Sequence, residues 1–178
     1  YLPNQTALIW LAELPLLCYA GLELKSRTIR LAGFLMFVWS MLYYALYVAG
    51  SGGAAELAGL GSVPISAFTA FAMALSFCGT FTLLRRAFAA GKITAFENVF
   101  VNLYPPAAAA FLLKGTFTAA APENLTLYVF LDALLLFAWG FLAKERNVRI
   151  YSVAFLAIGI ARLIGVDDYK VLSAARRW

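Results

Sequence analysis

Six long apolar runs constrain this chain more than any other feature of its sequence. Most are long enough to cross a hydrocarbon core of roughly 30 Å as helices. Hydrophobic residues make up 63% of the chain and charged residues 13%, whereas soluble domains are about 45–50% apolar. We therefore expect an all-α fold, a single transmembrane domain over residues 1–178 that lies in a lipid bilayer. Its six transmembrane helices are expected at about 6–24, 31–49, 64–84, 97–113, 125–143 and 150–166.

The basic residues predict how these helices are oriented. One set of inter-helix links carries nine of the 14 basic residues, whereas the opposite links carry only Lys114. Basic links stay cytoplasmic, so both termini are expected on the outer, periplasmic side. Because these charges alternate with apolar runs and form no patch, the net charge of +5 does not indicate a nucleic-acid partner. The nine residues are Lys25, Arg27, Arg30, Arg85, Arg86, Lys92, Lys144, Arg146 and Arg149.

Several kinds of chemistry lack their usual residues. The chain has no histidine, which is the commonest catalytic base and metal ligand. Cys18 and Cys78 are 60 positions apart inside apolar runs, as expected of small buried side chains. No nucleophile–base pair and no glycine-rich phosphate loop is recognisable. We therefore expect no enzymatic activity, no catalytic residue, no metal site and no cofactor.

A shift of 119 residues aligns the two ends of the chain without a gap. Gly21 then falls on Gly140, and the basic residues of Lys25–Arg30 fall on those of Lys144–Arg149. This match predicts a partial repeat with a four-helix unit, in which segments one and two correspond to five and six. The alternative is that both turns share only topology signals. Half of a repeat unit leaves a packing face uncovered, so we expect other membrane chains, or further repeats of a longer parent chain, at that face.

The two matching hairpins also carry a resemblance. The segments LLCYAGLELKSRTIRLAGFLMF and LLLFAWGFLAKERNVRIYSVAFLAI, with ARLIGVDDY, resemble uncharacterised bacterial many-pass membrane proteins built from repeated helical hairpins. Arg162 followed five residues later by Asp167 belongs to this resemblance, which covers about half the chain. It implies a many-helix bacterial envelope protein without an established activity, which we expect in the inner membrane, and it transfers no site residue. Because Tyr1 is not preceded by methionine, we also expect a processed chain or a piece of a longer one.

Charged residues inside the apolar runs are the first candidates for an intramembrane polar site. Glu13 and Asp132 are related by the same 119-residue shift and lie near the centres of their runs. An acid at the centre of a span costs about 2.5–3.5 kcal/mol on insertion scales, so both are expected to face the protein interior. Arg162 is their natural partner if the depths match. These residues either carry protons or cations or fix the packing of helices, and the sequence leaves both interpretations open.

The fourth run contains the second candidate. Asn98 and Asn102 lie one turn apart and precede Tyr104, Pro105 and Pro106. Two prolines at mid-span remove two backbone donors and predict a break or kink. Broken helices at the membrane midplane often line transport sites. The alternative is a kinked helix that lets a neighbouring helix approach closely.

Small residues at helical spacing predict close helix packing in two further runs. In the third run they are Ser66, Ala70, Ala74, Cys78 and Thr82; in the sixth they are Ala157, Ala161 and Gly165. Short links and packing faces favour a non-catalytic subunit or scaffold of a membrane assembly. The alternative function is a transporter or ion-coupled carrier that uses the buried carboxylates.

Overall fold

The computed structural model describes residues 3–49, 54–57 and 61–167, which form two compact units, Tyr1–Ala119 and Ala120–Trp178. The first unit contains α1 (Pro3–Glu23), α2 (Arg27–Tyr43), β1 (Ala54–Leu57), β2 (Gly61–Pro64), α3 (Ile65–Ala89), α4 (Ala95–Val101) and α5 (Tyr104–Ala119). The second contains α6 (Leu125–Leu142) and α7 (Arg146–Arg162). Helices α2 and α7 each continue as five-residue π-helical segments, η1 (Tyr44–Val48) and η2 (Leu163–Asp167). The termini, whose side of the membrane was predicted, lie outside the described residues.

Four helices are long and apolar enough to cross a membrane. They cover Arg27–Val48, Ile65–Ala89, Leu125–Leu142 and Arg146–Val166. Many of their side chains that point away from the helix contacts are large and apolar, such as Leu35, Leu75 and Leu142, which are 72%, 76% and 80% exposed. Such surfaces suit lipid rather than water. The expectation of a helical, membrane-compatible fold is confirmed at this level.

The fourth predicted span, 97–113, differs from the structure at both ends. The chain forms a seven-residue helix, α4, and then a separate 16-residue helix, α5, which continues to Ala119. Pro105 and Pro106 occupy the first turn of α5, where backbone N–H groups have no helical partner anyway. The prolines therefore begin a helix rather than kink one at mid-span. The interruption predicted from them is present, but it lies before them, at residues 102–103.

A proline inside α1 is compensated by a neighbouring helix. Pro15 has no N–H, so the carbonyl of Leu11, four residues earlier, lacks its helical donor. The hydroxyl of Ser76 in α3 donates a hydrogen bond of 2.7 Å to that carbonyl. This bond satisfies a backbone group that lipid cannot hydrate and fixes α1 against α3.

The core of the first unit is aromatic. Tyr104 is fully buried, and its ring centroid lies 4.3 Å from that of Phe37 and 6.0 Å from that of Phe77. Phe111 packs edge-on against Phe77 and Tyr44. Helix α3 packs against α1 and α5, while α1 also packs against α2. Rings from α2, α3 and α5 therefore pack together in this core.

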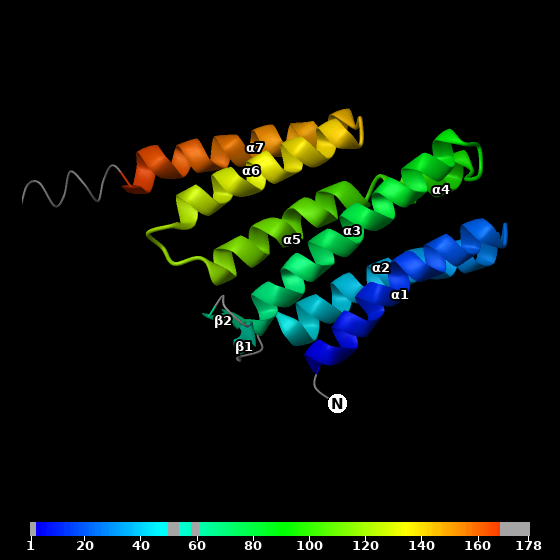
Figure 1. The fold of residues 1–178 in the computed structure, drawn as a ribbon, viewed down its shortest axis with the longest axis horizontal. Coiled ribbons are helices and arrows are strands. Elements are labelled where there is room, and N and C mark those ends of the chain that lie inside the picture. Colours follow the sequence, from blue (N-terminus) through cyan, green and yellow to red (C-terminus); the bar gives the residue numbers. More distant parts are fainter. Residues whose placement is uncertain (1–2, 50–53, 58–60, 168–178) are drawn as a thin grey trace, which may run out of the picture. The chain divides into compact units, whose positions relative to one another are not determined.

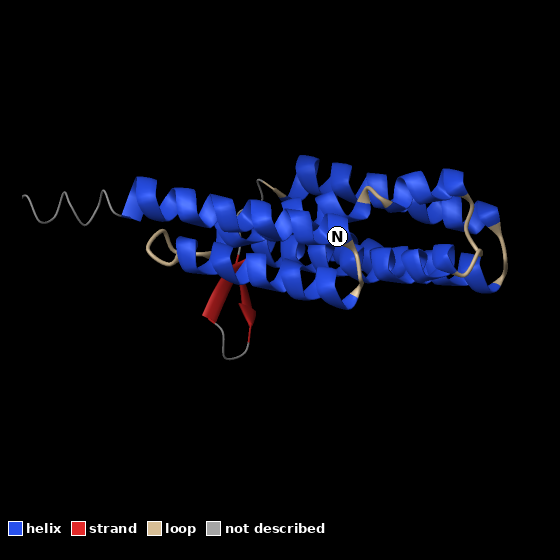
Figure 2. Cartoon of the chain, turned by 90° about the horizontal axis from the view of Figure 1, so that it is seen from above, coloured by secondary structure: helices blue, strands red, loops and turns tan. Residues whose placement is uncertain are grey.

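The link between α2 and α3 contains two short strands. In β1 and β2, Ala54 pairs with Pro64 and Leu57 pairs with Gly61 in antiparallel register. The antiparallel ladder satisfies backbone groups that an irregular link would leave to solvent. Figure 2 shows this hairpin projecting from the helices of its unit.

The small-residue face predicted for α3 is buried over most of its length, whereas the face predicted for α7 is exposed. Ser66, Ala70 and Ala74 are buried in α3. In α7, however, Ala157, Ala161 and Gly165 are exposed. The face of α7 that packs against α6 instead carries Val148, Ser152, Phe155 and Gly159. Small residues permit close packing but do not by themselves select the face, because larger side chains fill the same interface.

Candidate functional site

A buried ion pair joins three elements at one end of the first unit. The Nε atom of Arg30, in α2, donates a hydrogen bond of 2.8 Å to Oε1 of Glu97, in α4. The Nη1 atom of Arg30 donates to the carbonyl of Gly21, in α1, at 3.1 Å. The side chains of Arg30 and Glu97 are 7% and 0% exposed. One guanidinium therefore connects the ends of α1, α2 and α4, which lie at the same end of the unit in Figure 1.

Glu97 also completes the N-terminal cap of α4. The hydroxyl of Thr94 accepts a hydrogen bond from the Glu97 backbone N–H, while Oε2 of Glu97 accepts from the Thr94 N–H and hydroxyl. This reciprocal capping box satisfies helix-terminal donors. Burial alone would raise the pKa of Glu97, but the hydrogen bonds from Arg30 and Thr94 and the charge of Arg30 hold it below its ordinary value of 4.5. The carboxylate is therefore kept ionised although it is buried.

The approach of Arg30 to α1 requires glycine at position 21. A Cβ atom on Gly21 would lie 2.6 Å from Cγ and 2.8 Å from the backbone nitrogen of Arg30. The backbone nitrogen cannot move away without displacing α2. Gly21 thus allows α1 and α2 to meet closely enough for Arg30 to reach the Gly21 carbonyl.

The second hairpin has the same local geometry at positions 119 residues later. A Cβ atom on Gly140 would lie 2.8 Å from Cγ and 2.9 Å from the backbone nitrogen of Arg149. Lys25 and Lys144 have positive φ angles of 52° and 56°. The last residue of the first helix, the first residue of the second and the π-helical segment also fall at corresponding positions. The Arg149 side chain, however, has no hydrogen-bond partner among the described residues of its own unit.

Of the residues predicted in the fourth run, only some point inward. Tyr104 is fully buried, and its hydroxyl has no hydrogen-bond acceptor among the described residues, although it lies beside the thiol of Cys18. Asn98 accepts a hydrogen bond of 3.1 Å from Arg85. Asn102 is exposed at the end of α4. Pro105 is buried in the first turn of α5, and its neighbour Pro106 is half-buried.

The charged residues predicted in the spans fall in different units. Glu13 is half-buried on α1, in the first unit. In the second unit, Asp132 is 5% exposed on the buried face of α6. Arg162 lies at the end of α7 and donates a hydrogen bond of 3.1 Å to the carbonyl of Pro122. This contact directs its guanidinium toward the link before α6, whereas Asp132 lies about two helical turns inside that helix.

The sequence interpretation missed the roles of Arg30 and Glu97. Arg30 was counted only as a charge of a cytoplasmic link. The signal that identifies Arg30 is Gly21, nine residues earlier, which recurs as Gly140 before Arg149. No group of three or more Cys, Asp or Glu side chains lies close enough to hold a metal ion among the residues that the structure describes.

Comparison with models of protein families, with curated proteins and with solved structures finds no match to this chain. The geometry of its own residues therefore carries the functional argument.

Proposed function

We propose that the protein is a non-catalytic, multi-pass subunit or scaffold of a membrane assembly. In this proposal α1 and α5 also cross the bilayer of a bacterial inner membrane, and the basic end of the first unit faces the cytoplasm. The hairpin α6–α7 is half of a repeated four-helix unit, and it binds further helices of the assembly.

The observation that carries the proposal is the correspondence between Arg30 and Arg149. Both arginines lie against a glycine of the preceding helix at nearly the same distances. Arg30 is neutralised by a carboxylate from α4. Arg149 is half-buried and has no such partner among the described residues of its unit. An arginine next to apolar surface is best stabilised by a carboxylate, so we expect a partner helix to supply one.

The packing of aromatic side chains inside the first unit also favours a scaffold over a carrier. Phe37, Phe77, Tyr104 and Phe111 pack against one another between its helices. A carrier needs a polar route between its two gates. Packed rings instead give a rigid body on which other chains can assemble.

The test is native mass spectrometry of the full-length protein, extracted gently from its own membrane. We expect partner chains at fixed stoichiometry, and we expect Arg149→Gln to release at least one of them. Arg146→Gln is the matched control, because Arg146 lies in the same turn but is exposed. A lone monomer for the wild type, or equal release by both variants, would contradict the proposal.

The alternative function is a proton- or cation-coupled carrier, and one observation favours it. Asp132 is 5% exposed on the inner face of a helix long enough to cross a membrane. Such buried acids often serve as relays. Proton and monovalent-cation flux into proteoliposomes would decide, because the carrier requires flux that disappears in the Glu13→Gln, Asp132→Asn double variant.

A further inference from the structure

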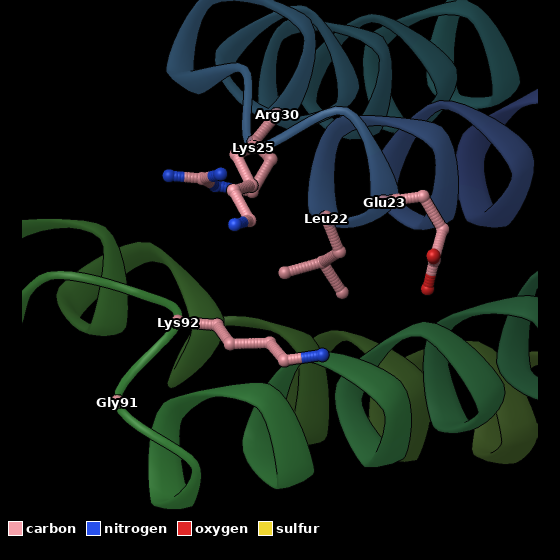
Figure 3. A pocket seen from close by; sticks show the side chains of 6 residues that line it. All are labelled: Leu22, Glu23, Lys25, Arg30, Gly91 and Lys92. Carbon is pink, nitrogen blue, oxygen red and sulfur yellow. The ribbon is translucent and has the colours of Figure 1, made fainter.

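A pocket of about 400 Å³ opens beside the buried ion pair, at the basic end of the first unit. Figure 3 shows that it lies between the turn joining α1 to α2 and the turn joining α3 to α4. Its lining residues are Leu22, Glu23, Lys25, Arg30, Gly91 and Lys92. The two turns supply side chains from positions far apart in the sequence.

The charge of this pocket is positive. Arg30 lines it, but its charge is already met by Glu97. The remaining charged side chains are the two lysines, Lys25 and Lys92, and one acid, Glu23. In Figure 3 the lysines extend from opposite turns, Glu23 lies on the side away from Lys25, and the Lys92 ammonium group points toward the side of Glu23. Two ammonium groups on either side of a concave surface suit an anion that has several acceptor oxygens.

The backbone holds both lysines in defined positions. In each turn the helix ends in a Schellman motif, with N–H donors of Ser26 and Lys92 bonded to Gly21 and Ala87 carbonyls at 3.0 and 2.9 Å. The left-handed position of the second turn is occupied by Gly91, at φ +71°. The same position of the first turn is occupied by Lys25, at φ +52°. Lys25 therefore occupies a position that favours glycine, and its side chain lines the pocket.

Apolar surface adjoins the charged lining. Leu22 lines the pocket. Leu24, in the turn between α1 and α2, is 68% exposed, and Phe96, in α4, is 56% exposed. A polar, cationic recess at the ends of apolar helices matches an amphiphile, and basic pockets between membrane helices bind lipid headgroups. We propose that this pocket binds the phosphate group of a membrane lipid headgroup between Lys25 and Lys92, with the acyl chains along the apolar helix surface. Glu23 then accepts a hydrogen bond from a headgroup hydroxyl or amine.

The second hairpin provides an internal control for this proposal. Lys144 has the same backbone conformation and the same place in its turn as Lys25. It belongs to the other compact unit. A general attraction of lysine for anionic lipid acts on Lys144 as much as on Lys25, whereas a built site depends on Lys25 and Lys92 together.

The experiment titrates dihexanoyl phosphatidylglycerol into the full-length, delipidated protein in a neutral detergent. Calorimetry measures the heat of binding. We expect saturable binding that weakens at least tenfold in the Lys25→Gly, Lys92→Gln double variant. Lys144→Gly is expected to bind like the wild type. Because Lys25→Gly places the favoured residue at a positive φ angle, the double variant is expected to stay folded, and circular dichroism checks this.

Two further ligands separate the possible sources of the phosphate. Dihexanoylglycerol, which has the chains without the phosphate, is expected not to compete. Inorganic phosphate is expected to compete at least a hundredfold more weakly than the lipid; equal competition would show a free-anion site and overturn the lipid assignment. Unchanged binding in the double variant, or equal loss in Lys144→Gly, would overturn the site itself. None of these outcomes depends on partner chains, so the test is independent of the proposed scaffold function.

Discussion

The hairpins α1–α2 and α6–α7 share their turns but differ in what surrounds them. Both turns end a helix with a lysine in the left-handed conformation, and both bring an arginine against a glycine. In the first hairpin the arginine also reaches the buried Glu97. In the second, the described residues of the same unit offer Arg149 no equivalent carboxylate.

This difference separates local from tertiary causes. The turn conformation follows from residues within the hairpin, because it recurs in the second unit, which has no described counterpart of α3 and α4. The burial of the arginine follows from α4, because Arg30 is 6% exposed whereas Arg149 is half-buried. The same local structure therefore holds a buried ion pair in the first unit. In the second unit, the described residues supply no carboxylate to the arginine.

The largest expected effect tests this distinction at the two arginines. Arg30→Gln leaves the carboxylate of Glu97 buried without its cation, so we expect a loss of about 3–5 kcal/mol in the free energy of unfolding. Arg149→Gln, at the matching position, is expected to change the stability of the isolated protein by less than about 0.5 kcal/mol. Unfolding in sodium dodecyl sulfate, followed by circular dichroism, measures both.

Acid provides a second measure of the same ion pair. Because the pKa of Glu97 is held below 4.5, its carboxylate stabilises the fold above that pH. The contribution is lost as the pH falls through the lowered folded-state pKa. Wild type and Arg149→Gln should share this acid sensitivity, and Glu97→Gln should lack it. Equal losses of stability in Arg30→Gln and Arg149→Gln would contradict a stabilising Arg30–Glu97 ion pair. An acid response that persists in Glu97→Gln would contradict it as well.

Much of the helical organisation was predictable because apolar length and short basic links are local signals. The links expected at Lys25–Arg30 and Lys144–Arg149 overlap the observed turns, although their last four residues already belong to α2 and α7. The fourth span was not, because Pro105 and Pro106 have two compatible positions, inside a helix or in its first turn. The cap formed by Thr94 and Glu97 marks where α4 begins, but it does not mark where that helix ends.

The candidate site was harder to predict than the fold. Asp132 is buried, as an acid within a span was expected to be. Arg162, however, contacts the Pro122 carbonyl, and its position depends on how α7 meets the link before α6. The pairing of Arg30 with Glu97 joins residues 67 positions apart, and no periodicity within one helix contains that information.

A smaller effect is expected at the two glycines, and there the hairpins should agree. Gly21→Ala and Gly140→Ala each place a methyl group within 3 Å of a backbone nitrogen, so each should lose about 1–3 kcal/mol. Gly79→Ala is the control, because nothing lies within 4 Å of a Cβ atom there. That variant should gain up to about 1 kcal/mol from helix propensity. A loss at Gly21 alone would mean that the two turns are not equivalent.

The smallest expected effect concerns the lysines of the two turns, and it has the opposite sign. A left-handed residue other than glycine costs about 1–2 kcal/mol, whereas a cation at a helix C-terminus contributes about 0.3–1 kcal/mol. Lys25→Gly and Lys144→Gly should therefore each raise the free energy of unfolding by about 0.5–1 kcal/mol, whereas Gly91→Ala, at φ +71°, should lower it. Detergent unfolding at low protein concentration measures these differences. Equal gains at Lys25 and Lys144 would show that the strain is set within each turn, whereas a loss at Lys25 alone would mean that its side chain stabilises the first unit by more than the backbone strain costs.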